Sequence, residues 1–539
     1  MSRVYTGEWV VSALLEDRAE RFGTEIAVAS EQGTLTYDDL VDRAARLAGG
    51  LAALGVAPGD RVATMLPTGN GYLAAWHACV WLGAIEVPVN VEYRGPFLEH
   101  ILRDSGASVL VVHARWLTRL ATIELPHIRH LVVTGAADDE DEAQAGAELP
   151  PGIAVHSFDD VLGHDPVPRR ASSDLDLTYI MYTSGTTGRS KGVVHNNRSS
   201  FHYLMPFVEG LDLQDDDVCY SMFPLFHQMG RSACTTAALW AGNRVELRSG
   251  FSASHFWDDI RACGATWAGY FGAVILFLWQ NAPSPRDRDH RLTRAFGSHA
   301  AAELIVKWEE RFGVTLYEVY GSTEIGLGSG LGPGYPRKQG TMGLPCRQVQ
   351  VAIVDEHDNP LPPGRVGEAV WRPKEPFAIF QGYWNLPQAT LDVSRNLWFH
   401  SGDAALLDED GFFVFKDRMK DTIRRRGENI SSFEVEIVVR SQPGVAECAA
   451  FALTVPGATT EEEVAIAVVP SPEGGPDPEK LFRALCLELP RHAVPRYLRF
   501  CDELPKTPTQ KVEKFRLRSD GVTPDTVDRE ALGIFPARE

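Results

Sequence analysis

One run of hydroxyl, glycine and lysine residues has the composition of a phosphate-binding loop. Its glycines let successive backbone N–H groups converge on an anion, while hydroxyl groups and one ammonium add donors and positive charge. A Walker A loop would place Ser or Thr after the lysine, where this chain has Gly192. A flexible linker fits less well, because an apolar run of strand length (177–181) directly precedes the loop. The candidate anion-binding residues are Thr183, Ser184, Gly185, Thr186, Thr187, Gly188 and Lys191.

Residues 182–192 match the signature Y-T-S-G-T-T-G-x-x-K-G in full, so the chain resembles the adenylate-forming superfamily of acyl-CoA synthetases, peptide-synthetase adenylation domains and beetle luciferases. Within it, the chain is most similar to the carnitine- or crotonobetaine-type CoA ligases. The resemblance implies an α/β fold in which a large multi-layer N-terminal domain precedes a small, mobile α+β lid. It also implies ATP, Mg²⁺ and coenzyme A as ligands.

A second motif, residues 320–324, matches Y-G-x-T-E. The resemblance implies that Tyr320 lies against adenine, that the Thr323 hydroxyl contacts the α-phosphate and that Glu324 binds magnesium. This chemistry suits a carboxylate, because Mg²⁺ prefers hard oxygen ligands and bridges phosphate oxygens. The further nucleotide contacts implied are Gly297, Ser298 and Gly321.

Two later segments complete the implied nucleotide site and connect it to the lid. Residues 398–403 resemble W-F-x-T-G-D, which implies that Asp403 accepts hydrogen bonds from the ribose hydroxyls. Residues 417–430 resemble D-R-x-K-D-x-I-x-x-x-G-E-N-I. This implies that Arg418 is a second ribose contact, that Lys420 is the hinge and that Gly427 lines the tunnel for the pantetheine arm.

Two basic features of the C-terminal region remain. Residues 504–512 resemble L-P-K-T-x-x-G-K-[IV], so Lys511 aligns with the catalytic lysine that reaches the α-phosphate and the reacting carboxylate. The triplet Arg424-Arg425-Arg426 has two open interpretations, a solvated basic turn or a contact for coenzyme A phosphates.

The sequence motifs for the acid-binding pocket are weaker than those for the nucleotide. Residues 223–230 resemble F-P-L-x-H-x-x-G, which implies that His227 lines this pocket and contributes to catalysis. The expected other walls are Tyr270, Phe271, Gly272 and Gly328. Aromatic walls favour a compact or planar acid over a long fatty chain.

Alternating helices and continuous apolar strands support the α/β class. Apolar runs between helices are typical of parallel strands that are covered on both faces. The pattern predicts helices over 9–22, 72–82, 434–440 and 478–489, with Thr36 capping another, and strands over 26–30, 60–66, 84–89, 108–112, 130–134, 177–181, 447–454, 463–469 and 498–500. The predicted domains are 1–416 and 422–539, with a hinge at 417–421.

Composition excludes several classes of function. A net charge of −20 disfavours binding to nucleic acid or anionic membranes, because the mean field repels polyanions. The chain has no apolar run long enough to span a membrane, and its first residues lack the apolar core of a secretory signal. We therefore expect a cytoplasmic enzyme without nucleic-acid or membrane partners, and a homodimer stays open. The eight cysteines form no C-x-x-C pair, so no zinc site is expected.

The motifs together predict an ATP-dependent ligase that converts a carboxylic acid to an acyl-AMP and transfers it to coenzyme A. One alternative activates nitrite and transfers it to an aryl amine, and another transfers the acyl group to a carrier protein or an amine. A third alternative is a catalytically dead ATP-binding protein, against which the intact Lys511, Glu324 and Asp403 argue.

Overall fold

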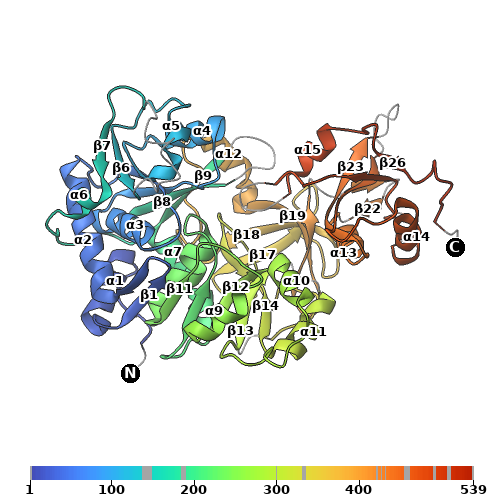
Figure 1. Ribbon diagram of the computed structural model, residues 1–539, viewed down its shortest axis with the longest axis horizontal. Helices are drawn as coiled ribbons and strands as arrows, with labels where there is room; N and C mark the ends of the chain where they lie inside the picture. Colours follow the sequence, from blue (N-terminus) through green and yellow to red (C-terminus); the bar gives the residue numbers. More distant parts are fainter. Residues whose placement is uncertain are drawn as a thin grey trace. The chain divides into compact units, whose positions relative to one another are not determined.

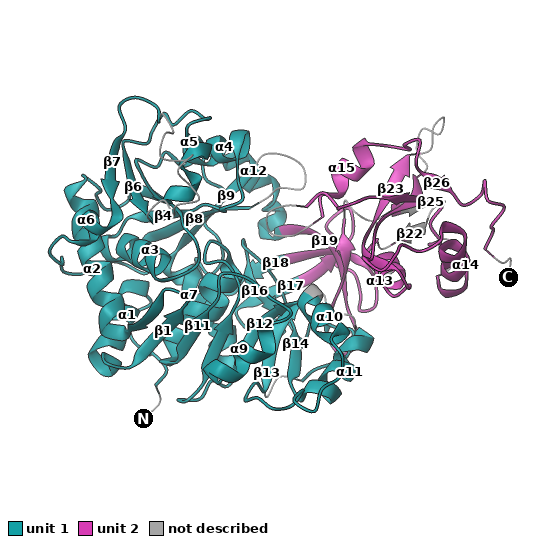
Figure 2. Cartoon of the chain, in the orientation of Figure 1, with its two compact units in different colours: residues 1–351, 371–399, 411–413 teal, residues 352–370, 400–410, 414–539 magenta. Residues whose placement is uncertain are grey.

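The computed structural model describes residues 3–135, 149–183, 190–298, 300, 302–330, 336–419, 423–425, 428–430, 432–454, 462–489, 493–506 and 512–536. The chain forms two compact units (Figure 2). Unit 1 contains residues 1–351, 371–399 and 411–413, and unit 2 contains residues 352–370, 400–410 and 414–539. The predicted α/β class, with a larger N-terminal and a smaller C-terminal part, is confirmed.

Unit 1 contains two seven-stranded sheets (Figure 1). The first has the order β14-β13-β12-β10-β11-β1-β2 and is parallel except for the antiparallel β1–β2 hairpin. Its strands are β1 (Ile26–Ser30), β2 (Gly33–Thr36), β10 (Val218–Ser221), β11 (Arg244–Leu247), β12 (Trp267–Phe271), β13 (Arg294–Ser298) and β14 (Thr315–Glu318). The carboxyl ends of β12, β13 and β14 therefore meet at one edge of this sheet.

The second sheet has the order β7-β6-β5-β3-β4-β8-β9 and is parallel except for the antiparallel pair β8–β9. Its strands are β3 (Arg61–Met65), β4 (Ile85–Pro88), β5 (Val109–His113), β6 (His130–Thr134), β7 (Ala154–Ser157), β8 (Leu177–Thr183) and β9 (Lys191–Asn196). Most of their side chains are buried, as predicted for strands that are covered on both faces.

A pair of helices separates the two sheets. Helix α2 (Tyr37–Ala53) contacts β1 and β2 of the first sheet, and α3 (Asn70–Leu82) contacts β3 and β4 of the second. The two helices also pack against each other. Thr36 caps α2 as predicted: its hydroxyl accepts from the Asp39 N–H at 3.1 Å, and the Asp39 carboxylate accepts from the Thr36 N–H.

Several shorter elements complete unit 1. The helices are α1 (Val11–Phe22), α4 (Gly95–Ser105), η1 (Ala114–Trp116), α5 (Leu117–Leu120), α6 (Phe158–Leu162), α7 (Asn197–Gly210), the π-helix η3 (Met229–Thr236), α8 (Ala237–Ala241), α9 (Phe256–Cys263), α10 (Gly272–Gln280), α11 (Ala302–Phe312), α12 (Pro387–Asp392) and η4 (Arg395–Leu397). Strands β15 (Tyr320–Ser322) and β16 (Gly326–Ser329) form an antiparallel hairpin.

Residues 349–418 contain a four-stranded sheet for which the sequence analysis predicted no strands. Its order is β17 (Val349–Val354), β18 (Gly367–Pro373), β19 (Phe399–Leu407) and β20 (Phe413–Arg418). The chain passes from one unit to the other within each of these four strands. The last passage lies between Phe413 and Val414, just before the hinge proposed at 417–421.

The rest of unit 2 is the α+β structure that the sequence predicted. Its main sheet has the order β23-β24-β25-β26 and is covered by apolar residues from α13 and α14. The elements are β21 (Ile423–Arg425), β22 (Glu428–Ile430), α13 (Ser432–Arg440), β23 (Val445–Thr454), β24 (Glu462–Pro470), α14 (Pro478–Glu488), β25 (Tyr497–Phe500), α15 (Lys514–Ser519) and β26 (Val527–Asp528).

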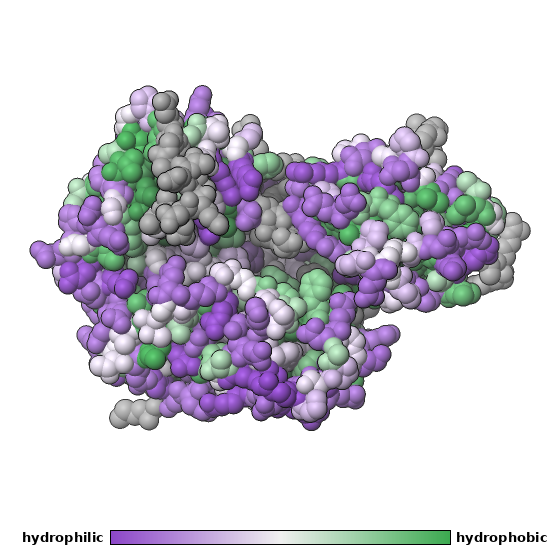
Figure 3. All heavy atoms as spheres, viewed as in Figure 1, coloured by the Kyte–Doolittle hydropathy of each residue, from purple (hydrophilic) through white to green (hydrophobic). Residues whose placement is uncertain are grey.

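The surface of the molecule is largely polar on the side drawn in Figure 3. The face shown in Figure 3 is mainly hydrophilic, with smaller hydrophobic areas between polar ones. Within the described ranges, no helix combines the length and the apolar composition that crossing a membrane requires.

Candidate functional site

The predicted phosphate loop joins the two antiparallel strands β8 and β9. Thr183 pairs with Lys191 and Tyr182 pairs with Gly192, so the ends of the loop are held side by side by backbone hydrogen bonds. This strand–loop–strand arrangement differs from the strand–loop–helix of a Walker A motif. Ser184, Gly185, Thr186, Thr187 and Gly188 lie outside the described residues, and their role stays a prediction.

Helix α4 contacts both ends of this loop. The His100 ring nitrogen Nε2 lies 2.9 Å from the carbonyl oxygen of Ser190, at the C-terminal end of the loop. At the other end, the Tyr182 hydroxyl donates to the Asp104 carboxylate at 2.6 Å. Burial and the neighbouring Asp104 carboxylate together raise the pKa of Tyr182, so its hydroxyl stays a donor. These two side chains, one helical turn apart on α4, thus contact residues on either side of the loop.

The Tyr320 ring is oriented by two other aromatic rings. It stacks on Trp371 with a centroid distance of 5.3 Å and lies 4.7 Å from Phe413. Tyr320 is buried, and it belongs to the β15–β16 hairpin together with Gly321. Gly328 on β16 packs against the same Trp371 indole. The residue proposed to lie against adenine is therefore held by packing rather than left to rotate.

A buried histidine supports the backbone of Thr323. The His195 ring nitrogen Nε2 lies 2.8 Å from the Thr323 carbonyl oxygen, and Nδ1 lies 3.0 Å from the Ser199 hydroxyl. Burial lowers the pKa of His195 to about 4, against the opposing effect of the Thr323 carbonyl. The ring is therefore neutral at pH 7, and the carbonyl acceptor places its proton on Nε2. The sequence analysis did not identify His195.

Glu324 is held through its backbone and its carboxylate. Its carbonyl oxygen accepts from the Phe380 N–H at 2.8 Å, and its carboxylate accepts from the Tyr383 hydroxyl at 3.0 Å. Among the described residues, no group of three or more His, Cys, Asp or Glu side chains could hold a metal ion. The single carboxylate of Glu324 suits Mg²⁺, which proteins bind through one or two carboxylates together with substrate phosphates.

A tyrosine–glutamate pair occupies the carboxyl edge of the first sheet. Tyr270, Gly297 and Glu318 are neighbours in register on β12, β13 and β14. The Tyr270 hydroxyl donates to the Glu318 carboxylate at 2.7 Å, across the central strand. A Cβ at Gly297 would lie 2.1 Å from the Tyr270 carbonyl oxygen and 2.6 Å from its ring, so this close approach requires glycine. Ligands of parallel sheets bind at such edges.

The remaining pocket residues extend this edge. Phe271 pairs with Ser298 in register, and Gly272 begins α10. The Phe271 ring packs edge-on against Phe223 at 4.8 Å, which brings the segment that contains His227 beside β12. The His227 ring nitrogen Nδ1 accepts from the Met229 N–H at 3.3 Å, at the start of η3. Glu318, which the sequence analysis missed, adds a carboxylate to these aromatic walls.

In unit 2, the two proposed ribose contacts form a pair. The Arg418 Nε atom lies 2.9 Å from the Asp403 carboxylate, which is almost completely buried. Gly402 has φ = +68°, a left-handed conformation that favours glycine and turns the chain immediately before Asp403. Its N–H donates to the Glu368 carboxylate at 3.0 Å. This turn orients the Asp403 side chain toward Arg418.

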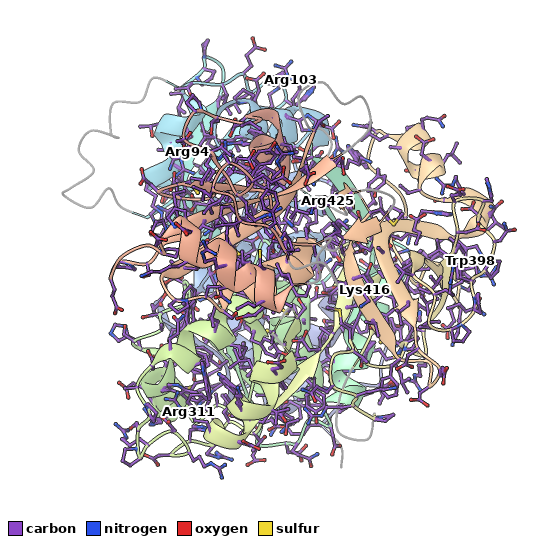
Figure 4. The ribbon with its side chains drawn as sticks, turned by 90° about the vertical axis from the view of Figure 1, so that its right-hand side faces the viewer. Arg94, Arg103, Arg311, Trp398, Lys416 and Arg425 are labelled. Atoms are coloured by element: carbon purple, nitrogen blue, oxygen red, sulfur yellow. The ribbon has the colours of Figure 1, made fainter. Side chains whose placement is uncertain are left out.

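Arg425 does not fit either interpretation of the basic triplet. The side chain (labelled in Figure 4) is buried, and its Nε atom pairs with the Glu463 carboxylate at 2.7 Å. A solvated turn and a contact for coenzyme A phosphates are therefore both wrong for Arg425. An arginine that satisfies a buried glutamate on β24 is a structural residue.

Three proposed residues of unit 2, Lys420, Gly427 and Lys511, lie outside the described residues, and their roles stay predictions. The base of the segment that contains Lys511 is described. Lys506 and Val512 form an antiparallel bridge, and the Glu513 N–H donates to the Pro505 carbonyl at 2.7 Å.

Two family models match this chain. The model of the AMP-binding enzyme family matches residues 15–384, and that of the AMP-binding enzyme C-terminal domain matches residues 434–511. The chain is 33% identical over 522 residues to a feruloyl-CoA synthase from Amycolatopsis, covering 95% of this chain and 98% of that protein. It is 29% identical to a crotonobetaine/carnitine–CoA ligase from Escherichia coli O8, covering 93% and 98%.

The fold is also that of a solved structure. An anthranilate–CoA ligase in complex with anthranoyl-AMP superimposes with a TM-score of 0.83 at 24% identity, covering 96% of this chain and 98% of that one.

Proposed function

Because this chain belongs to the family of AMP-binding enzymes, we propose that it is an AMP-forming acid–coenzyme A ligase whose nucleotide is bound by the residues described above. In the first half-reaction, a carboxylate oxygen attacks the α-phosphorus of ATP, the bond to the β-phosphate oxygen breaks, and pyrophosphate leaves. In the second, the thiolate sulfur of coenzyme A attacks the acyl carbon of the acyl-AMP, and AMP leaves.

The observation that carries this proposal is the arrangement of two separate motifs around strand β9. Lys191 at the start of β9 belongs to the phosphate loop, and His195 near its end holds the backbone of Thr323. Thr323 and Glu324 thereby lie beside the strand that carries the phosphate-binding lysine. A structural protein has no need to combine a basic loop, a metal-ligating carboxylate and a buried supporting histidine in this way.

Each residue then has a defined role. Lys191, Thr323 and the loop at 183–188 bind the phosphates, Tyr320 with Gly297, Ser298 and Gly321 binds adenine, and Asp403 with Arg418 binds ribose. Mg²⁺, held by Glu324 and phosphate oxygens, neutralises charge on the transferring group. Lys511 adds a positive charge where negative charge develops in the transition state. Lys420 is the hinge, and Gly427 admits the pantetheine arm.

The acid substrate in this proposal is compact and aromatic. The aromatic side chains of Phe271, Phe223 and Tyr270 gather at the carboxyl edge of the first sheet, where Phe271 is partly exposed, and His227 follows Phe223 in the same segment. The relation to a feruloyl-CoA synthase supports the same class of substrate. The proposal also includes a cytoplasmic location. The oligomeric state is a separate question, and size-exclusion chromatography with light scattering would distinguish a monomer from a homodimer.

A pyrophosphate-release screen tests the function. The purified enzyme is incubated with Mg·ATP and substituted cinnamic acids, benzoic acids, carnitine, short fatty acids or nitrite, each with and without coenzyme A. We expect pyrophosphate with an aromatic acid, acyl-AMP without coenzyme A and a thioester with it, as identified by mass spectrometry. Activity only with nitrite and an aryl amine, or none with any acid, would refute the ligase assignment.

A further inference from the structure

Residues 380–384 form an additional edge segment along strand β9. Val193 and Tyr383 form an antiparallel bridge, and the Trp384 N–H donates to the Gly192 carbonyl at 2.7 Å. On the other side of this segment, the Phe380 N–H donates to the Glu324 carbonyl at 2.8 Å. The segment therefore lies between the phosphate-loop hairpin and the Y-G-S-T-E motif.

Tyr383 contacts a charged residue of each motif with a different part of its side chain. Its hydroxyl donates to the Glu324 carboxylate at 3.0 Å. The Lys191 ammonium lies over its ring, 4.8 Å from the centroid. Tyr383 is itself buried, with 8% of its surface exposed, so packing limits the motion of the ring. One side chain thus joins the proposed metal ligand and the proposed phosphate-binding cation.

We propose that Tyr383 is a positioning residue that holds Glu324 and Lys191 in the geometry required to bind Mg·ATP. This inference rests on the proposed function. The hydroxyl group occupies one oxygen of the Glu324 carboxylate and directs the other toward a metal ion. Groups that hydrogen-bond a metal ligand fix its orientation, and their loss lowers metal affinity.

The ring has a separate effect on Lys191. An aromatic face attracts an ammonium group through its quadrupole and does not accept a conventional hydrogen bond from it. The N–H groups of Lys191 can therefore be directed to phosphate oxygens while the charge is held over the ring. Phenylalanine at position 383 would keep this second effect and remove the first, which makes the two separable.

The test measures nucleotide binding rather than turnover. The binding of α,β-methylene-ATP to the full-length protein is measured by calorimetry over a range of Mg²⁺ concentrations and also without metal. Tyr383→Phe should raise the Mg²⁺ concentration for half-maximal binding about ten-fold. It should leave metal-free binding within about two-fold, because the ring remains under Lys191. Tyr383→Leu should weaken metal-free binding as well.

Tyr220→Phe is the matched control, because the Tyr220 hydroxyl also donates to a carboxylate, that of Asp259, at 3.1 Å. It should change the melting temperature about as much as Tyr383→Phe and leave the Mg²⁺ dependence unchanged. If Tyr383→Phe lowers the melting temperature but binds Mg²⁺ and nucleotide like wild type, Tyr383 is only structural and the inference is wrong. If wild type itself shows no Mg²⁺-dependent nucleotide binding, the proposed function fails and the inference fails with it.

Discussion

Individual side chains of unit 1 act on the proposed ligands through a neighbouring residue. His195 supports the carbonyl of Thr323, Tyr383 holds the carboxylate of Glu324, and Glu318 accepts the hydroxyl hydrogen bond of Tyr270. Each supporting group donates a hydrogen bond to the residue that it holds or accepts one from it. A buried polar group that loses its partner costs about 1–3 kcal/mol, so these pairs define the positions of the residues that they hold.

The residue with the largest expected effect on the first half-reaction is Lys511. Lys511→Ala should lower acid-dependent ATP–pyrophosphate exchange about a hundred-fold or more, because the charge that stabilises the transition state is removed. The thiolysis of supplied acyl-AMP should stay close to wild type. The exposed Lys480 on α14 provides a matched control, Lys480→Ala. Near-normal exchange by Lys511→Ala would show that another residue is the catalytic lysine.

At the scale of elements, unit 2 holds the base of the Lys511 segment through one lysine, Lys514, whose side chain is 13% exposed. The Lys514 ammonium at the start of α15 lies 2.8 Å from the Glu436 carboxylate and 2.5 Å from the Ser432 hydroxyl, both on α13. The Ser432 N–H donates in turn to the Asp417 carboxylate at 2.7 Å. This chain of contacts connects the beginning of α15 with Asp417, the first residue of the proposed hinge.

Lys514→Met should therefore impair adenylation more than thiolysis. We expect ATP–pyrophosphate exchange to fall about ten-fold, because the loss of a charged hydrogen bond worth about 1–3 kcal/mol loosens the base of the Lys511 segment. The exposed Lys480→Met is the matched control. Hydrogen exchange in α13 and α15 should increase, while the tryptophan fluorescence transition stays unchanged, since all twelve tryptophans belong to unit 1. Equal losses in both half-reactions would contradict a specific role for Lys514.

For the whole molecule, two buried histidines make stability depend on pH. Burial lowers the pKa of His77 to about 3, with the Arg231 guanidinium adding to the effect, and that of His195 to about 4. Both groups return to about 6.5 on unfolding. As the pH falls from 6.5 toward 4, the unfolded chain takes up protons that the folded chain cannot, so stability is lost in this window. Above pH 6.5 these histidines do not change the free energy of unfolding as the pH changes.

Urea unfolding followed by tryptophan fluorescence between pH 7 and 4.5 measures this effect. Each histidine should contribute a slope of up to about 1.4 kcal/mol per pH unit. His77→Leu replaces a buried imidazole by an apolar side chain. The number of protons taken up on unfolding should fall by about one, and the slope of the free energy of unfolding against pH should fall accordingly. Wild-type and His77→Leu curves with the same slope would show that His77 is protonated in the folded state.

The acceptor of the activated acid is a second property of the whole enzyme. Gly427→Leu should leave acyl-AMP formation largely intact and block thioester formation, because a side chain would overlap the pantetheine arm. Quantitation by mass spectrometry should then find acyl-AMP accumulating on the enzyme. An unchanged yield of a product that forms without coenzyme A would identify an amine or a nitrite-derived acceptor chemistry instead.

Local patterns in the chain were sufficient to predict the class of fold and most strands and helices, and to identify the nucleotide motifs. Continuous apolar runs predicted the strands β3, β4, β5 and β6, and a Thr–Asp capping pair predicted the start of α2. These signals depend on residues a few positions apart, so one sequence contains them completely. The sheet at 349–418 was missed although β17 contains the apolar run 351–354, because the other strands carry apolar runs of only three or four residues beside polar and charged ones.

Only the tertiary structure revealed the side chains that support the motifs. Tyr383 and Glu324 are 59 residues apart, His195 and Thr323 are 128 apart, and Tyr270 and Glu318 are 48 apart. Arg425 was expected either in a solvated basic turn or at coenzyme A phosphates, and its burial against Glu463 overturned both interpretations. A hydrogen bond or an ion pair depends on a separation of about 3 Å in space, and spacing along the chain does not encode that separation.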